Sequence, residues 1–245
     1  MTDTLFISDL HLAPERPQIM QLFIDFTRQI AASANSLYIL GDFLEVWWGD
    51  DDPATAYQSV FDAIVELVDK HHTTVYLMHG NRDFMIGQAL AERCHFELIN
   101  DPCKMMIAGQ KALLIHGDSL CTDDIAYQKF RQMVRNPLWQ QQALSKTLEE
   151  RYAMAHSIRE QSKSSNALKA EEIMDVNEAA TRQLFIDQNI SLLIHGHTHR
   201  PAIHQLNINN KPVQRIVLGD WYKQGNYCRI SPNKPAEIIA YPTDA

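Results

Sequence analysis

The chain has 245 residues, of which 45% are hydrophobic and 21% charged, and its formal net charge is −8. This length fits one large α/β domain or a domain with an insertion, and the acidic balance argues against a general affinity for nucleic acid. The four cysteines form no C-x-x-C pair, which indicates reduced thiols. No apolar run approaches the roughly 18–20 residues of a membrane span, and the N-terminus lacks a signal-peptide pattern. We therefore expect a cytosolic protein that is soluble or, at most, attached to a membrane surface.

The first 120 residues alternate short apolar runs with helical periodicity. Apolar residues recur at helical spacing from Ile19 to Ile30 and from Val60 to Val68, which predicts an amphipathic helix in each range. Strands that alternate with helices imply a parallel sheet covered on its faces. We predict buried strands over the apolar runs 5–7, 37–40, 75–78, 113–115 and 192–194.

Two hairpins are predicted from turn signals between apolar runs. The first turn lies at residues 108–110, and the second at Asn209-Asn210 between residues 202–207 and 212–218. Two closing strands are expected at residues 228–230 and 237–241.

Residues 123–188 are predicted to form a helical insertion in a core of residues 1–122 and 189–245. They show only helical periodicity, and the stretch 121–170 carries eight basic and five acidic side chains in a chain of net charge −8. A solvated helical face would explain most of these charges. An insertion that begins directly after a polar motif would also suit a lid that attracts an anionic substrate.

A polar motif follows each of the five predicted strands. Alone, each motif would be read as a turn, a helix cap or a satisfied histidine. Five in order favour a common site, because the carboxyl ends of parallel strands meet at one edge of a sheet. The motifs are Asp9-Leu10-His11, Gly41-Asp42, Gly80-Asn81-Arg82-Asp83, His116-Gly117-Asp118 and Gly196-His197-Thr198-His199.

Carboxylate, imidazole and amide oxygen without thiolate suit two hard-to-borderline divalent metals. Two metals roughly 3.5–4 Å apart activate water and neutralise phosphoryl oxygens, so we predict hydrolysis of a phosphate ester or anhydride. Asp42 is the candidate bridge, and His195 is treated as a strand-end residue outside the site. The predicted ligands are Asp9, His11 and one of His197 and His199 for the first metal, and Asn81, His116 and the other terminal histidine for the second.

These motifs resemble those of the calcineurin-like metallophosphoesterase superfamily. The resemblance implies a four-layer α/β/β/α sandwich in which two facing sheets are flanked by helices, here with a helical lid insertion. The chain differs from most members at Arg82, where they have a histidine thought to protonate an alkoxide leaving group. Arginine stays protonated but can hold a phosphate through its planar fork. This difference fits a leaving group that is itself a phosphate, and hence a pyrophosphate bond.

Almost the whole chain resembles bacterial pyrophosphatases that act on a UDP-diacylglucosamine lipid in lipid A biosynthesis. The stretches 41–51, 80–84, 162–169 and 173–177 carry this resemblance. It implies hydrolysis to UMP and 2,3-diacylglucosamine 1-phosphate, two Mn²⁺ ions per chain, and a peripheral position on the cytoplasmic face of the inner membrane. We expect no obligate protein partner. Carried over by position, the catalytic residues are Asn81, Arg82 and His197, and the substrate contacts are Asn81, Arg82, Asp124, Ser162, Asn166, Lys169 and His197.

Two other functions stay open at this point. A nucleotide or dinucleoside polyphosphate hydrolase on the same scaffold would need no apolar groove. A non-catalytic, protein-binding member of the superfamily would not need the full set of seven ligands, which is present here.

Overall fold

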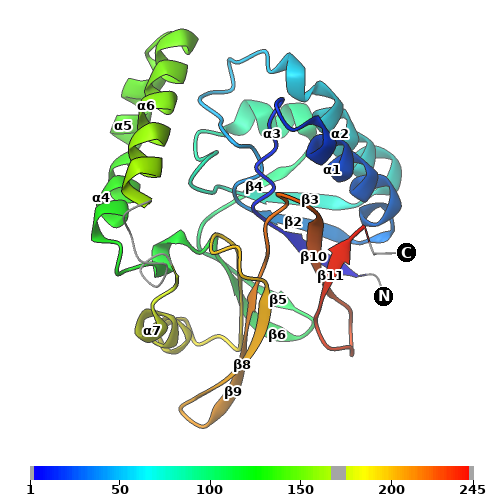
Figure 1. The fold of residues 1–245 in the computed structure, drawn as a ribbon. Coiled ribbons are helices and arrows are strands. Elements are labelled where there is room, and N and C mark those ends of the chain that lie inside the picture. Colours follow the sequence, from blue (N-terminus) through cyan, green and yellow to red (C-terminus); the bar gives the residue numbers. More distant parts are fainter. Residues whose placement is uncertain (1–2, 167–174, 243–245) are drawn as a thin grey trace.

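The structure is a computed structural model that describes residues 3–166 and 175–242; the side chains of residue 159 and of residues 161–166 are not described. Two β-sheets face each other, and helices cover their outer faces (Figure 1). This arrangement confirms the predicted α/β/β/α sandwich.

The first sheet has the strand order β11-β10-β1-β2-β3-β4. Neighbours from β1 to β4 are parallel, whereas β10 and β11 are antiparallel. The sheet is therefore mixed: its strands from the first 120 residues are parallel, as predicted, and the closing strands add antiparallel neighbours, since a short connection such as that between β10 and β11 permits only antiparallel pairing. The strands are β1 (Thr4–Ile7), β2 (Ser36–Leu40), β3 (Thr74–Met78), β4 (Glu97–Ile99), β10 (Gly225–Ile230) and β11 (Glu237–Tyr241).

The second sheet has the order β5-β6-β7-β9-β8. Its two hairpins turn at Ala108-Gly109 and Asn209-Asn210, as predicted. All four turn residues have positive φ, from 47° to 81°, which matches the twist of two-residue hairpins. The strands are β5 (Cys103–Ile107), β6 (Gln110–Leu114), β7 (Leu192–His195), β8 (Ala202–Ile208) and β9 (Lys211–Val217).

Helices α1 (Pro17–Gln29), α2 (Gln58–His71) and α3 (Gln88–Cys94) cover the first sheet, and α7 (Glu178–Gln188) covers the second (Figure 1). Apolar clusters fill the three spaces between the four layers. One cluster lies under α1–α3, and another lies under α7 around Phe185. The cluster between the sheets contains Phe6, Leu40, Met78, Leu114, Ile194, Ile216 and Cys228. Short 3-10 turns occur at Ala31–Ser33, Thr55–Tyr57 and Asp118–Leu120.

Helices α4 (Ile125–Val134), α5 (Pro137–Leu144) and α6 (Leu148–Asn166) stand together beside the sandwich (Figure 1). Asn136 caps the N-terminus of α5. Its side chain accepts a hydrogen bond from Leu138 N at 2.8 Å, and Pro137 is the first residue of the helix. The predicted insertion, residues 123–188, also included α7. In the structure α7 packs on the second sheet around Phe185, whereas α4–α6 join the apolar cluster under α1–α3 through Val134, Ala143 and Ala155.

All four cysteines are free thiols. None of the helices in residues 3–166 and 175–242 is both long and apolar enough to cross a membrane.

Candidate metal centre

The five polar motifs meet at one edge of the two facing sheets. The first three follow β1, β2 and β3 of the first sheet, and the other two follow β6 and β7 of the second. Backbone hydrogen bonds join neighbouring loops: Asp9 N donates to Gly41 O at 3.1 Å, and Gly196 N donates to His116 O at 2.8 Å. Each sheet therefore contributes part of one site.

Five predicted ligands have a left-handed backbone. The φ angle is 55° at Asp9, 49° at His11, 52° at Asp42, 68° at His197 and 56° at His199. Few non-glycine residues adopt this conformation, although aspartate and histidine tolerate it better than most. Such residues cluster at functional sites, where the surrounding structure imposes the conformation.

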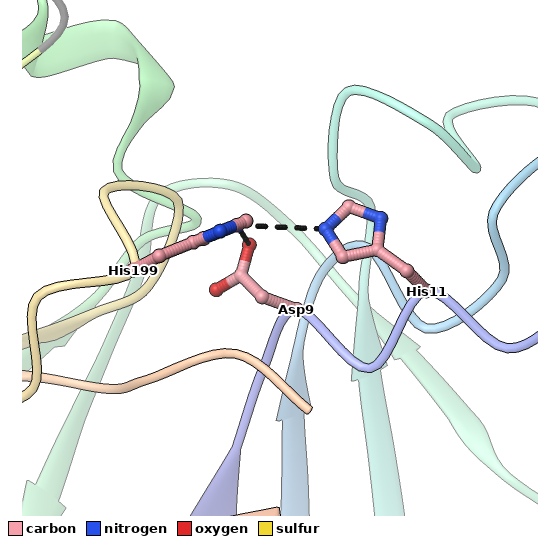
Figure 2. A group of neighbouring side chains, drawn as sticks. All are labelled: Asp9, His11 and His199. Atoms are coloured by element: carbon pink, nitrogen blue, oxygen red, sulfur yellow. Dashed lines mark hydrogen bonds and ion pairs between the residues drawn. The ribbon is translucent and has the colours of Figure 1, made fainter. Parts of the chain in front are cut away.

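Asp9, His11 and His199 form the first group of candidate ligands (Figure 2). His199 Nε2 lies 3.3 Å from Asp9 Oδ1 and 3.5 Å from His11 Nε2. The other oxygen of Asp9 accepts hydrogen bonds from the Ser8 hydroxyl at 2.6 Å and from His197 N at 2.8 Å. Asp9 Oδ1 is buried and has no hydrogen-bond donor among the described residues, so it faces the two imidazoles unsatisfied.

Asp9, Asp42 and His116 form the second group, and Asn81 and His197 lie beside it. Asn81 Oδ1 lies 2.9 Å from His116 Nε2 and 3.0 Å from His197 Nδ1. His116 Nδ1 lies 2.9 Å from Leu40 O and donates its proton there. The Nε2 atom therefore faces Asn81 Oδ1, and in the neutral ring it carries the lone pair that a metal ion would use.

Asp42 lies between the two groups. Its Oδ2 is 3.7 Å from His11 Nε2 in the first group, and its Oδ1 is 3.9 Å from His116 Nε2 in the second. Asp9 belongs to both groups as well. Asp42 Oδ1 also accepts a hydrogen bond from Arg82 N at 2.8 Å, which fixes the orientation of the carboxylate.

The electrostatics of the site favour positive charge at its centre. Burial raises the pKa of Asp9, but the nearby imidazoles of His199, His116 and His11 outweigh burial and hold that pKa well below its usual range. Burial lowers the pKa of His116, yet the carboxylates of Asp42, Asp118 and Asp9 raise it to about 9. A bound cation would satisfy the same carboxylates in place of the proton. The donor set and the unsatisfied Asp9 oxygen therefore fit divalent metal ions.

Two motif glycines permit the close approach of the loops. A Cβ on Gly80 would lie 2.1 Å from Asp42 Oδ1, and a Cβ on Gly196 would lie 2.3 Å from Asp9 Oδ2. Each glycine therefore leaves the space that a neighbouring carboxylate occupies.

Asp83 and Arg82 have different environments. The Asp83 carboxylate accepts backbone hydrogen bonds from Gly80 N and Phe43 N, both at 2.8 Å, and so joins the second and third motifs. Burial and the charge of Asp42 raise the pKa of Asp83 to about 6. Arg82 Nε is buried and has no hydrogen-bond partner among the described residues, which suits a guanidinium whose partner is a ligand.

The predicted lid contacts lie partly outside the described residues. Asp124 caps α4, where its carboxylate accepts a hydrogen bond from Tyr127 N at 3.0 Å. Lys169 and the side chains of Ser162 and Asn166 are outside what the structure describes. His195 is buried and belongs to neither ligand group; its Nδ1 lies 2.9 Å from Gly196 O.

Two residues near the first group were missed from the sequence. Glu45 Oε2 lies 3.1 Å from His11 Nδ1, and Asp220 Oδ2 lies 3.5 Å from His199 Nδ1. Gly219-Asp220 follows β9, and Gly41-Asp42 follows β2, so the strand-end signal that identified Asp42 was available for Asp220 too.

Comparison with known proteins agrees with the fold. The calcineurin-like phosphoesterase family model matches residues 3–201, and the chain belongs to this family. Similar relatives are named UDP-2,3-diacylglucosamine hydrolase. The one from Marinobacter nauticus is 47% identical over 98% of both chains. Those from Cellvibrio japonicus and Stenotrophomonas maltophilia are 48% and 46% identical and cover 91% and 94% of this chain, and 92% and 95% of their own.

Proposed function

We propose that this protein hydrolyses the pyrophosphate bond of UDP-2,3-diacylglucosamine to UMP and 2,3-diacylglucosamine 1-phosphate in lipid A biosynthesis. The observation that carries the proposal is similarity along the whole chain to relatives named for this substrate. The convergence of carboxylates and imidazoles on one sheet edge supports a metal-dependent reaction.

The site would hold two divalent metals, with Mn²⁺ as the proposed ion. Asp9, His11 and His199 would bind the first; Asn81, His116 and His197 would bind the second, and Asp42 would bridge them. When bound, such a pair supplies a hydroxide near neutral pH and neutralises phosphoryl oxygens. Backbone N–H groups hold the two carboxylates in place by hydrogen bonds to Asp9 and Asp42. Gly80 and Gly196 leave the space that these carboxylates occupy.

Arg82 would hold the pyrophosphate. Water adds to one phosphorus and the P–O–P bond breaks, so the leaving group is a phosphate ester whose second pKa is near 6. Such a leaving group departs without a strong general acid. The guanidinium of Arg82 can bind the charge that develops on the phosphoryl oxygens, and its backbone N–H keeps Asp42 in place.

We assign binding of the head group to Asn81, Arg82, His197 and the lid residues Asp124, Ser162, Asn166 and Lys169. We also propose that the protein works on the cytoplasmic face of the inner membrane, where its lipid substrate would lie, and without an obligate protein partner. The names of the relatives support the choice of substrate, and the proposed place at the membrane follows from the lipid nature of that substrate.

The test compares turnover of UDP-2,3-diacylglucosamine, UDP-glucosamine without acyl chains, and a dinucleoside polyphosphate by the purified protein with Mn²⁺. We expect efficient release of UMP from the acylated substrate only. Preferred cleavage of the unacylated nucleotides would assign a nucleotide hydrolase instead. Failure to cleave any of the three, or a generic phosphodiester, would indicate a non-catalytic member of the family.

A further inference from the structure

Two carboxylates lie close to the Nδ1 atoms of the imidazoles in the first ligand group. Glu45 lies 3.1 Å from Nδ1 of His11, and Asp220 lies 3.5 Å from Nδ1 of His199. The Nε2 atoms of the two rings face each other at 3.5 Å (Figure 2). Each ring therefore has a carboxylate beside one nitrogen and the candidate metal position beside the other.

We propose that Glu45 and Asp220 are positioning residues that keep the protons of His11 and His199 on Nδ1. A neutral imidazole carries one N–H and one lone pair. A carboxylate that accepts the Nδ1 proton fixes the tautomer and the ring orientation, and it raises the basicity of Nε2. Both Nε2 lone pairs are then directed at one metal together with Asp9.

Glu45 is held in position by the loop after β2. It is 14% exposed, its backbone N–H donates to Leu12 O at 2.9 Å, and its Oε2 lies 3.8 Å from Arg16 Nη2. This support comes from the first sheet, since β2 belongs to it. The carboxylate therefore meets His11 without having to be ordered by a metal.

Asp220 is held by the turn between β9 and β10. Its Oδ1 accepts a hydrogen bond from Tyr222 N at 2.9 Å, and its backbone oxygen accepts one from Asn226 Nδ2 at 2.9 Å. Tyr222 stacks on the ring of His11, with centroids 5.3 Å apart and planes 7° apart. One turn thus orients His199 through a carboxylate and packs against His11.

The second group is built differently. His116 donates its Nδ1 proton to the backbone oxygen of Leu40 at 2.9 Å and not to a carboxylate. Loss of Glu45 or Asp220 should consequently weaken one metal-binding step and leave the other nearly unchanged. This expectation separates a positioning role from a general loss of structure.

The experiment measures Mn²⁺ binding to metal-stripped protein by isothermal titration calorimetry, with thermal unfolding of the metal-free protein as a check of folding. Glu45→Ala and Asp220→Ala should each raise the Kd of one Mn²⁺ by about 10–100-fold. Asp220→Asn should raise this Kd less than Asp220→Ala does, because an amide oxygen can still accept a hydrogen bond from Nδ1. Glu92→Ala and Asp187→Ala remove exposed carboxylates on α3 and α7 and serve as matched controls.

The inference rests on the proposed metal binding but not on the identity of the substrate. Absence of Mn²⁺ binding to the unmodified protein would refute the metal assignment itself. If the unmodified protein binds Mn²⁺ and the Glu45 and Asp220 variants bind it as tightly as the two controls, the positioning role is wrong. Equal weakening of both binding steps, or equal losses in Asp220→Asn and Asp220→Ala, would also overturn it.

Discussion

Removing Asp51 should destabilise the protein more than removing its partner Arg151. Arg151 lies on α6 with its side chain only 2% exposed, whereas Asp51 is 59% exposed. Both Nη atoms of Arg151 contact the Asp51 carboxylate, and Nη1 also donates to Trp48 O at 2.6 Å. A Cβ on Gly49 would lie 2.1 Å from the same Nη1, so the loop is shaped around this guanidinium.

The difference in burial sets the magnitudes. Asp51→Ala removes the main counter-charge of a buried cation, which costs about 2–3 kcal/mol, at or below the lower end of the range for a pair buried on both sides, because solvent screens the exposed Asp51. Arg151→Met keeps much of the apolar stem and returns Asp51 to water. Its main cost is the unsatisfied oxygen of Trp48, about 1–2 kcal/mol. In the double variant no buried cation remains, so its stability should approach that of Arg151→Met alone.

Urea unfolding of the four proteins measures these free energies as a double-mutant cycle. Glu66→Ala, which breaks surface pairs with Lys70 and Arg28, is the control and should change the free energy of unfolding much less than Asp51→Ala. The reasoning fails if Arg151→Met is more destabilising than Asp51→Ala. It also fails if the double variant is less stable than Asp51→Ala.

Three further predictions concern the metal centre. Arg82→Ala should lower turnover of UDP-2,3-diacylglucosamine by about 10²–10³-fold, as for other lost transition-state donors. Arg82→His should not restore it, and recovered turnover in Arg82→His would contradict the role of Arg82 in holding the pyrophosphate. A chelator should abolish turnover and Mn²⁺ should restore it best among divalent ions, so full activity after exhaustive metal removal would exclude a metal mechanism. Asp42→Ala should lower Mn²⁺ stoichiometry and turnover more than any other ligand change, whereas His195→Ala should be mild. If His195→Ala is as inactive as His197→Ala, the ligand pair has been chosen wrongly.

The layered fold could be predicted because its signals are local. The apolar runs that end at Ile7, Leu40 and Met78 form β1, β2 and β3, and positive-φ turns close the two hairpins. α3 and β4 were not predicted. Both are short, at 7 and 3 residues, and patterns of that length do not show a period.

The ligands could be found because strand ends converge, but the imidazole that each supporting carboxylate contacts could not be predicted. Asp9 and His11 lie two residues apart directly after β1, so sequence order alone places them together. Glu45 and Asp220 meet the imidazoles only through the packing of separate loops. No spacing rule links Asp220 to His199, because β8, β9 and two turns separate them.

The site also couples its chemistry to the packing of the two sheets. Asp9 comes from the first sheet and His199 from the second, and a backbone hydrogen bond links the two sides: Trp221 N, in the segment after β9 of the second sheet, donates to Asp9 O at 3.1 Å. A shift of one sheet against the other would separate Asp9 Oδ1 from His199 Nε2 before it disturbed either sheet internally. Metal affinity should therefore respond to substitutions between the sheets, around Phe6 and Ile194, that leave every ligand unchanged. Metal affinity at the first ligand group thus depends on the packing between the sheets as well as on the ligand side chains.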